Sequence, residues 1–307
     1  MAKNSPNNSF VDDVPMDLLE KHAVSVPILN GPTLREADAV GTLTTVKLAG
    51  RIFLITANHV FRNWADKGPL VAPILEAEVD SEIGPEKWVT INLKQFEWLT
   101  TKHGVTAEDP DGYYDIRVAL LPEEDNDKVN QDIILPIAPV SKINGPFSAV
   151  LTGYPEKKNT GEQIRKRTPR PWAKSYWYEL HSSDTPTGKD RLQFKWSHKN
   201  GNFMFENYVS DEKAEFKPCG SAAQPYGTSG GPLILLQSSN STDVPQYSVI
   251  GYGMEYDESG KTITAGPSDA IIDLARHLLL AEKGSNEITP TTDNQNLLKE
   301  QDYPDFL

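Results

Sequence analysis

Short apolar stretches separated by turns occur along most of the chain, with the spacing expected of β-strands. We predict strands at 39–48, 51–57, 88–93 and 116–121, because these stretches are rich in β-branched and aliphatic residues, and further strands at 147–152, 176–180, 192–196, 232–236 and 247–252. Ala49 and Gly50 separate the first two strands and indicate a hairpin turn. One helix is predicted near the end, where Ser268 is a suitable N-cap for apolar residues at helical spacing between 271 and 279.

Frequent short strands followed by one helix predict an all-β architecture of the barrel or sandwich type. The segment 136–146 (PIAPVSKINGP) is interrupted by prolines and lacks a period, so we place the boundary between two halves there. The halves are 18–140 and 141–283, and the second includes the helix. The ends contain little that can pack, so we expect a flexible N-terminal segment at 1–17 and a polar C-terminal tail at 284–307.

Charge and composition disfavour several classes of function. The formal net charge of −13 argues against general nucleic-acid binding. No apolar run approaches the roughly 20 residues of a membrane-spanning helix, and the N-terminus lacks the pattern of a secretory signal. Cys219 is the single cysteine and cannot form an internal disulfide, which favours a reducing compartment. We therefore expect a cytoplasmic protein without nucleic-acid or membrane partners.

One segment reverses the charge of this acidic chain. Residues 157–174 (KKNTGEQIRKRTPRPWAK) include seven Lys or Arg side chains and show neither helical nor strand periodicity. Two interpretations stay open. The segment is a solvated surface loop, as such runs usually are, or it is an exposed loop that binds an acidic partner or is itself cleaved.

Three short segments carry the residue types that acyl transfer needs. His59 follows the apolar stretch in LITANHV, Asp115 precedes the strand IRVALL, and Ser229 lies in YGTSGGPL just before the strand PLILL. A serine hydroxyl becomes nucleophilic when a base takes its proton, and imidazole, with a pKa of about 6.5, suits that role. A carboxylate on the other ring nitrogen fixes the tautomer, and glycines let backbone N–H groups face the developing oxyanion. We predict a triad of His59, Asp115 and Ser229, with Gly227 and Ser229 as oxyanion donors.

Each of these features is ordinary when taken alone. A histidine at a strand end is more often structural, an aspartate before a strand is usually a turn residue, and a glycine-rich turn can be a plain loop. The order His, Asp, Ser, with a strand beside each, is a stronger constraint. The remaining histidines show no metal-ligand spacing, and neither a phosphate-binding glycine loop nor a dinucleotide fingerprint occurs, so no metal or cofactor is predicted.

The three segments resemble the signature motifs of trypsin-like (chymotrypsin-fold) serine peptidases. TANHV is similar to TAAHC, YYDIRVALL to a motif of the DIALL type, and GTSGGP to GDSGGP. Residues 152–155 (TGYP) resemble the opening of the second barrel in bacterial members, and 264–269 (TAGPSD) resemble the close of that barrel in high-temperature-requirement proteases. The resemblance covers about residues 40–280. In motif style it is nearest to bacterial high-temperature-requirement and glutamyl endopeptidase-type members, without a PDZ domain.

The resemblance implies two six-stranded antiparallel β-barrels with a C-terminal helix, the first barrel at 18–140 and the second at 141–283. It implies a serine endopeptidase that hydrolyses a protein or peptide substrate through an acyl-enzyme. Thr228 departs from the digestive members, which have there an aspartate that pairs with a new N-terminal ammonium. Threonine cannot form that ion pair. The oxyanion loop is therefore either formed already or set by another event, such as the binding of an activating protein partner.

The predicted substrate pocket also departs from trypsin. Ala223, six residues before Ser229, stands where a trypsin has an aspartate, so a basic P1 side chain would lack its usual partner. We expect a pocket wall from 251–256 (GYGMEY), which contributes Gly253 and Glu255, with Tyr226 beside the oxyanion loop. Glu255 either attracts a basic side chain at the pocket mouth or is an exposed charge. With Ala223 in place of the aspartate, we expect a small or apolar P1 side chain.

Three alternatives stay open. Residues 227–231 also match G-x-S-x-G, the nucleophile elbow of α/β-hydrolase esterases, although the expected strand before the elbow and the Ser, Asp, His order are missing. A two-barrel module that binds peptides without cutting them is the second alternative, and the intact triad argues against it. The third is a protease that rests inactive until a partner binds.

Overall fold

The computed structural model describes residues 25–31, 37–64, 66–76, 88–102, 106, 111–129, 131–166, 175–196, 205–209, 214–218, 224–238 and 244–282. Several predictions concern residues outside this description. They are the two terminal segments, residues 167–174 of the basic segment, Cys219 and Ala223.

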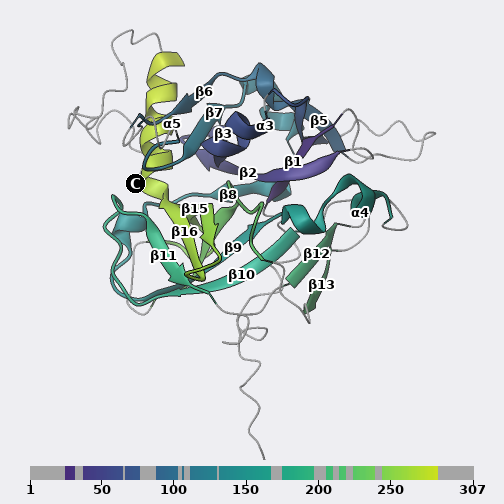
Figure 1. Ribbon diagram of the computed structural model, residues 1–307. Helices are drawn as coiled ribbons and strands as arrows, with labels where there is room; N and C mark the ends of the chain where they lie inside the picture. Colours follow the sequence, from purple (N-terminus) through teal and green to yellow (C-terminus); the bar gives the residue numbers. More distant parts are fainter. Residues whose placement is uncertain are drawn as a thin grey trace, which may run out of the picture.

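A curled sheet of eight strands occupies the first half of the chain and the upper part of Figure 1. Its order is β5-β4-β1-β2-β3-β7-β6, and β8 pairs with β2 in parallel whereas the other pairs are antiparallel. The strands are β1 (Val26–Asn30), β2 (Asp38–Leu48), β3 (Arg51–Ala57), β4 (Leu70–Glu76), β5 (Trp88–Asn92), β6 (Trp98–Thr100), β7 (Ile116–Leu120) and β8 (Ile134–Pro136).

A second antiparallel sheet of eight strands lies below the first in Figure 1. Its order is β11-β16-β15-β14-β9-β10-β12-β13. The strands are β9 (Phe147–Gly153), β10 (Ser175–Ser182), β11 (Leu192–Lys195), β12 (Phe205–Val209), β13 (Ala214–Pro218), β14 (Pro232–Ser238), β15 (Val249–Asp257) and β16 (Thr262–Pro267).

Three α-helices and five short 3₁₀ helices accompany the sheets among the described residues. The α-helices are α3 (Asn58–Trp64), α4 (Gly161–Arg165) and α5 (Ser268–Glu282). The 3₁₀ helices are η1 (Leu93–Gln95), η2 (Glu123–Lys128), η3 (Gln131–Ile133), η4 (Val140–Lys142) and η5 (Glu156–Lys158). No helix in this part of the chain is long and apolar enough to cross a bilayer.

The predicted all-β fold with two antiparallel sheets and a C-terminal helix is confirmed, but each sheet has eight strands where six were predicted. The additional strands are short or contain proline, as in β4 (LVAPILE) and β6 (WLT), so periodicity alone did not identify them. Pairing with longer neighbours makes them strands. The esterase alternative is wrong, because an α/β-hydrolase has a mainly parallel sheet flanked by helices, whereas these sheets are antiparallel apart from β8.

The central strand β3 is buried on both faces, which explains its uninterrupted apolar sequence. Ile52 and Leu54 point into the core of the first sheet, and Phe53 and Ile55 point into a second core between the two sheets. This alternation follows from the two-residue period of a strand. The core between the sheets also receives Ile234 and Val249 from the second sheet.

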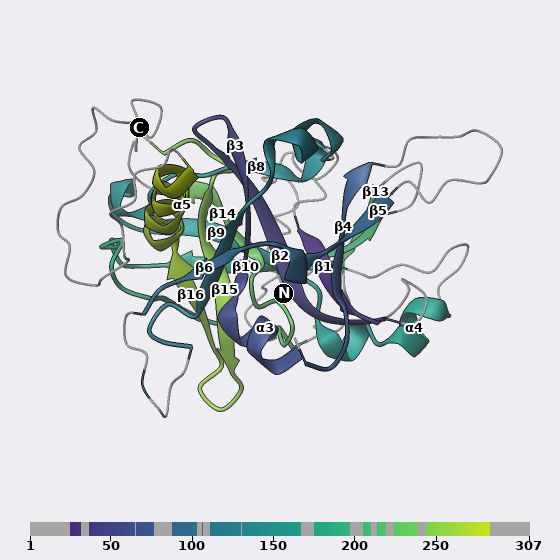
Figure 2. The ribbon, with the colours of Figure 1, turned by 90° about the horizontal axis from the view of Figure 1, so that it is seen from above.

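Helix α5 closes this core at one end, along both sheets (Figures 1 and 2). Ile271 and Leu274 are buried among residues of both sheets. The predicted N-cap, Ser268, is fully buried, and its hydroxyl accepts a hydrogen bond from Val140 N (2.9 Å) and donates one to Ala138 O (2.7 Å). This side chain therefore ties the helix start to the segment that connects the two sheets.

Replacing Ser268 by alanine tests this connection. Ser268→Ala leaves the buried Ala138 carbonyl and Val140 N–H without their partner, and each such group costs about 1–3 kcal/mol. We expect the free energy of unfolding to fall by about 2 to 4 kcal/mol, measured as a lower urea midpoint with an unchanged m-value. Ser183→Ala, at an exposed position, is the control, and a Ser268→Ala effect no larger than the control's would contradict the role.

Candidate active site

The first sheet places His59 and Asp115 side by side. Strand β3 ends at Ala57, which pairs with Ile116 at the start of β7, so the residues just beyond both strand ends are neighbours. Asp115 Oδ2 lies 2.6 Å from His59 Nδ1, and Asp115 Oδ1 accepts the backbone N–H of His59 at 2.9 Å. His59 itself is the second residue of α3, a short helix that the sequence analysis did not predict. Both carboxylate oxygens are therefore fixed on one histidine.

Asp115 adopts an uncommon backbone conformation, with φ of 43°. Aspartate tolerates this left-handed region better than most residues. The conformation lets the Asp115 carbonyl accept the N–H of Asn58 (3.1 Å) while the side chain reaches His59. The residue is buried, so the carboxylate and the imidazole meet with little intervening water.

The surroundings of His59 raise the pKa of its imidazole above the usual value of 6.5. Burial lowers this pKa, but the hydrogen bond and the negative charge of Asp115 outweigh it, and the charge of Asp111 raises it further while Arg62 lowers it. Asp111 is ion-paired with Arg62 at 2.6 Å and accepts a hydrogen bond from Asn58 Nδ2 at 3.0 Å. A second carboxylate thus acts electrostatically on the histidine.

The second sheet supplies Ser229, on a loop just before β14. Three carbonyl oxygens of this loop are held by strand β2 of the first sheet. Gly227 O accepts from Thr42 Oγ1 (3.1 Å), Ser229 O from Thr42 N (3.0 Å), and Gly230 O from Thr44 Oγ1 (2.7 Å). The loop that carries the serine is therefore fixed to the sheet that carries the histidine.

Two glycines let the loop take this path. Gly227 has φ of 91° and Gly230 has φ of 87°, a region that side chains rarely adopt. A Cβ at Gly230 would lie 2.2 Å from Thr42 O, and one at Gly227 would lie 2.6 Å from Glu156 N. The glycines predicted around the serine are thus required by conformation and by space.

The amides of Gly227 and Ser229 are the predicted oxyanion donors. Tyr226 O accepts the N–H of Glu156 at 3.0 Å. This carbonyl shares a trans peptide with the N–H of Gly227, and the two groups of a trans peptide point in opposite directions. The N–H of Gly227 therefore points away from Glu156. Among the described residues, neither the Gly227 N–H nor the Ser229 N–H donates to a protein acceptor. Both residues line the cavity that contains the serine.

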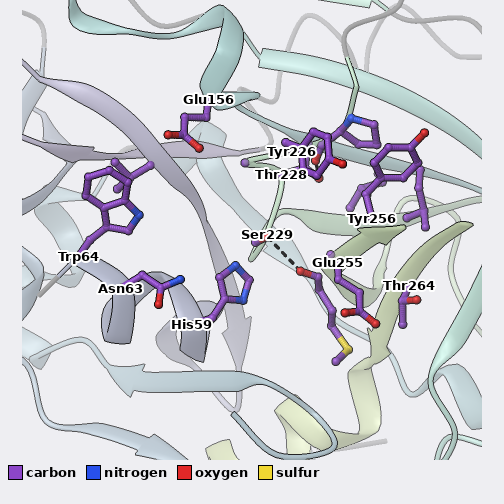
Figure 3. Close-up of a pocket in the computed structure, with 17 residues that line it drawn as sticks. His59, Asn63, Trp64, Glu156, Tyr226, Thr228, Ser229, Glu255, Tyr256 and Thr264 are labelled. Carbon is purple, nitrogen blue, oxygen red and sulfur yellow. Dashed lines mark hydrogen bonds between the residues drawn. The ribbon is translucent and has the colours of Figure 1, made fainter. Parts of the chain in front are cut away.

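The hydroxyl of Ser229 donates to the carbonyl oxygen of Met254 at 2.9 Å, as Figure 3 shows. In the same view the imidazole of His59 points toward Ser229, but no hydrogen bond joins the two side chains in the described part of the chain. Catalytic hydrogen bonds are often long or misaligned without substrate.

Thr228 stabilises its own turn without a charge. Its hydroxyl donates to Pro225 O at 2.7 Å, and its N–H donates to the same oxygen at 3.2 Å. The side chain is buried. Where digestive members of the resembled family have an aspartate, this loop is thus held by neutral hydrogen bonds.

A cavity of about 290 Å³ opens beside Ser229 and His59. Tyr226, Gly253 and Glu255, which the sequence analysis placed at the substrate pocket, line it, and Ala223 lies outside the described residues. The lining also includes residues that were not predicted: Pro225 and Thr228 from the serine loop, Met254 and Tyr256 from the predicted wall, and, from distant segments, Val40, Asn63, Trp64, Leu151, Glu156, Ile263 and Thr264. Met254 and Tyr256 lie in the segment predicted as the wall, whereas no local signal marks Trp64 or Glu156.

Tyr226, a lining residue of this cavity, contacts side chains from two other positions. Tyr226 donates its hydroxyl proton to Glu258 at 3.0 Å, and Gln224 Nε2 donates to the other oxygen of the same carboxylate at 2.5 Å. The rings of Tyr226 and Tyr256 meet edge to face, with centroids 5.4 Å apart. The side chain of Glu255 is 63% exposed and lies 3.9 Å from Arg191.

A second serine–histidine–carboxylate contact lies elsewhere, on the second sheet. Ser148 Oγ is 2.8 Å from His181 Nδ1, and His181 Nε2 is 3.1 Å from Glu179. Ser148 lies on β9, which pairs with a strand on each side, so the backbone amides there belong to the sheet ladder. None of the three residues lines the cavity. This contact lacks the free amides that an oxyanion needs.

No protein-family model and no curated protein matches the chain. Among the solved structures that are similar to it are the following two. An HtrA-type protease with a decapeptide has a TM-score of 0.41 at 9% identity, and the match covers 85% of this chain and 64% of that one. The serine endoprotease from Yersinia pestis has a TM-score of 0.38 at 13% identity, covering 83% and 62%. The chain therefore spans less than two thirds of the length of either protein.

The charges around His59 predict opposite effects of two substitutions. Asp111→Asn removes a negative charge and lowers the pKa of His59, whereas Arg62→Gln removes a positive charge and raises it. An NMR titration of the imidazole, assigned by comparison with His59→Gln, measures both. In the unsubstituted protein we expect the imidazole of His59 to have a pKa above 6.5. Shifts of the same sign in the two variants would contradict the electrostatic description.

Proposed function

We propose that this protein is a serine endopeptidase in which His59, Asp115 and Ser229 form the catalytic triad. The observation that carries the proposal is the pair of hydrogen bonds from His59 to Asp115. They hold the imidazole so that it points toward Ser229, beside the Gly227 and Ser229 amides, which donate to no described protein acceptor. A carboxylate on Nδ1 leaves Nε2 as the basic nitrogen. A general base, a nucleophile and oxyanion donors then surround one cavity, as acyl transfer requires.

The reaction follows from these positions. The Ser229 hydroxyl turns from Met254 O to His59 Nε2, gives its proton to the imidazole and attacks the peptide carbonyl. Asp115 stabilises the imidazolium, and the amides of Gly227 and Ser229 bind the oxyanion. His59 then protonates the leaving amine, the peptide bond breaks, and an acyl-enzyme remains. Water, deprotonated by the same histidine, hydrolyses the ester and restores the hydroxyl.

The conformation of the oxyanion loop supports the interpretation that it is formed already. Tyr226 O, Gly227 O and Ser229 O each have a partner in the chain. An activating protein partner and a cytoplasmic location stay predictions. Activity of the isolated chain decides between a formed loop and a partner-dependent one.

A peptide-binding module without catalysis is the second candidate. The observation that favours it is the hydrogen bond of Ser229 to Met254 O, which points the hydroxyl proton away from His59. Both candidates share the fold and the cavity. They differ in whether Ser229 reacts as a nucleophile.

Labelling with a fluorophosphonate tests the nucleophile. We expect rapid labelling of Ser229 and loss of labelling in Ser229→Ala, because the probe needs an activated serine and an oxyanion site. Ser148→Ala is a matched control that removes the serine hydrogen-bonded to His181 and leaves labelling unchanged. Labelling should increase with pH through a midpoint above 6.5, since the neutral form of His59 is the base and its pKa is raised.

The outcome of this experiment separates the two candidates. A folded protein that does not label, and that still binds peptides, supports the module. Labelling that persists in Ser229→Ala and disappears in Ser148→Ala refutes the assignment of the nucleophile.

A peptide library tests the predicted specificity. Leu151 and Ile263 contribute apolar side chains to the cavity, and Glu255, which also lines it, has a side chain 63% exposed to solvent. We expect cleavage after small or apolar residues about 10-fold or more faster than after Lys, Arg, Asp or Glu, because a buried charge would be unpaired. Glu255→Gln should leave this order unchanged. A preference for Lys or Arg that disappears in Glu255→Gln would show that the exposed carboxylate sets the specificity.

A further inference from the structure

Thr42 lies where the two sheets meet behind the oxyanion loop. It is a residue of β2, in the first sheet, and its side chain is fully buried. The hydroxyl makes two hydrogen bonds, both to the second half of the chain. It donates to Gly227 O at 3.1 Å and accepts from Tyr154 N at 3.1 Å. One buried hydroxyl thus joins three segments that are far apart in the sequence.

The two partners of this hydroxyl act on the same peptide groups. Tyr154 is followed closely by Glu156, whose N–H is bonded to Tyr226 O and so fixes the peptide between Tyr226 and Gly227. The Thr42 hydroxyl fixes the next peptide, between Gly227 and Thr228, through Gly227 O. The N–H of Gly227 belongs to the first of these peptides. Its direction is set from both sides.

This double restraint matters because Gly227 is a glycine. With no Cβ it can reach many backbone conformations, and a rotation of the peptide before it would turn the N–H away from the cavity. The backbone bond from Thr42 N to Ser229 O does not restrain Gly227 directly. Among the described residues, three bonds restrain the peptides on either side of Gly227: Glu156 N to Tyr226 O, the Thr42 hydroxyl to Gly227 O, and Thr228 N to Pro225 O. Of these, the bond from Thr42 is the one that a side chain of the first sheet supplies.

We propose that Thr42 is a positioning residue for the oxyanion hole, which its hydroxyl sets through Gly227. The inference rests on the proposed endopeptidase function. In this proposal, a side chain of the first sheet orients an oxyanion donor that lies on the loop just before β14 of the second sheet. Thr42 does not line the cavity, and it acts on the substrate carbonyl through the Gly227 amide.

Valine tests the hydroxyl because it keeps the size and branching of threonine. In Thr42→Val, Gly227 O and Tyr154 N lose their partner. We expect kcat to fall about 10- to 100-fold, which is below the loss expected for removing an oxyanion donor outright, while KM changes less than about threefold. The affinity of a peptide aldehyde, whose hemiacetal places an oxyanion in the site, should fall in parallel with kcat. The affinity of the matching peptide alcohol, which forms no oxyanion, should not.

Three further variants separate positioning from stability. Thr42→Ser retains the hydroxyl and should recover kcat to within about threefold of the unsubstituted enzyme. Thr45→Val is the matched control, since Thr45 is a buried threonine of the same strand whose hydroxyl bonds Ile133 O, away from the loop. It should lose stability without losing kcat. Thr42→Cys, with a weakly donating thiol, replaces the valine variant if the latter does not fold, and its kcat should be intermediate.

Failure of the positioning role and failure of the proposed function would give different results. If the unsubstituted protein does not react with a fluorophosphonate, the endopeptidase proposal fails, and the ¹⁵N–¹H signal of Gly227 tests the positioning instead. We expect that signal to move in Thr42→Val and not in Thr45→Val. If the enzyme is active and folded Thr42→Val retains its kcat, or loses kcat only as Thr45→Val does, the positioning role is wrong.

Discussion

The need to satisfy the backbone of the serine loop constrains the rest of the site. Residues 224–231 form no strand or helix, yet parts of this loop are buried, and buried carbonyl groups require hydrogen-bond partners. Strand β2 provides them, through the side chains of Thr42 and Thr44 and the backbone N–H of Thr42. Separating the two sheets would leave these carbonyls unpaired. The same contacts that hold the sheets together therefore also set the position of Ser229 relative to His59.

Apolar packing between the sheets makes this arrangement rigid. Phe53 and Ile55 of the first sheet pack with Ile234 and Val249 of the second in one continuous core. Close-packed side chains resist sliding, because a shift of one sheet would open voids along the whole interface. The antiparallel pairing of β3 with β7 then sets the spacing between His59 and Asp115. The geometry of the site is thus a consequence of strand register and of the packing beneath it.

The parts of this structure that could be predicted from the sequence are those with a local signal. The apolar strand before His59 and the glycines around Ser229 mark positions where chain direction and conformation are locally determined. Short α3 and the proline-containing β4 carry no such signal, since pairing and packing with distant segments form them. The same holds for the Tyr226–Glu258 contact and for Thr42. A threonine within an apolar strand resembles any β-branched strand residue until its partner at Gly227 is known.

The absence of charge in the described serine loop has a consequence for how the site depends on pH. A loop held by an ion pair weakens when either partner titrates, so its stability and its chemistry both change with pH. Here Thr228 bonds Pro225 O, and Thr42 bonds Gly227 O, and neither hydroxyl titrates in the physiological range. The group that does respond is His59, whose imidazole is bonded to Asp115 and has its pKa raised further by the charge of Asp111. Protonation thus acts on His59, while the hydrogen bonds that Thr228 and Thr42 make in the serine loop do not depend on it. On the proposed function, a change of pH is therefore expected to act on turnover through His59.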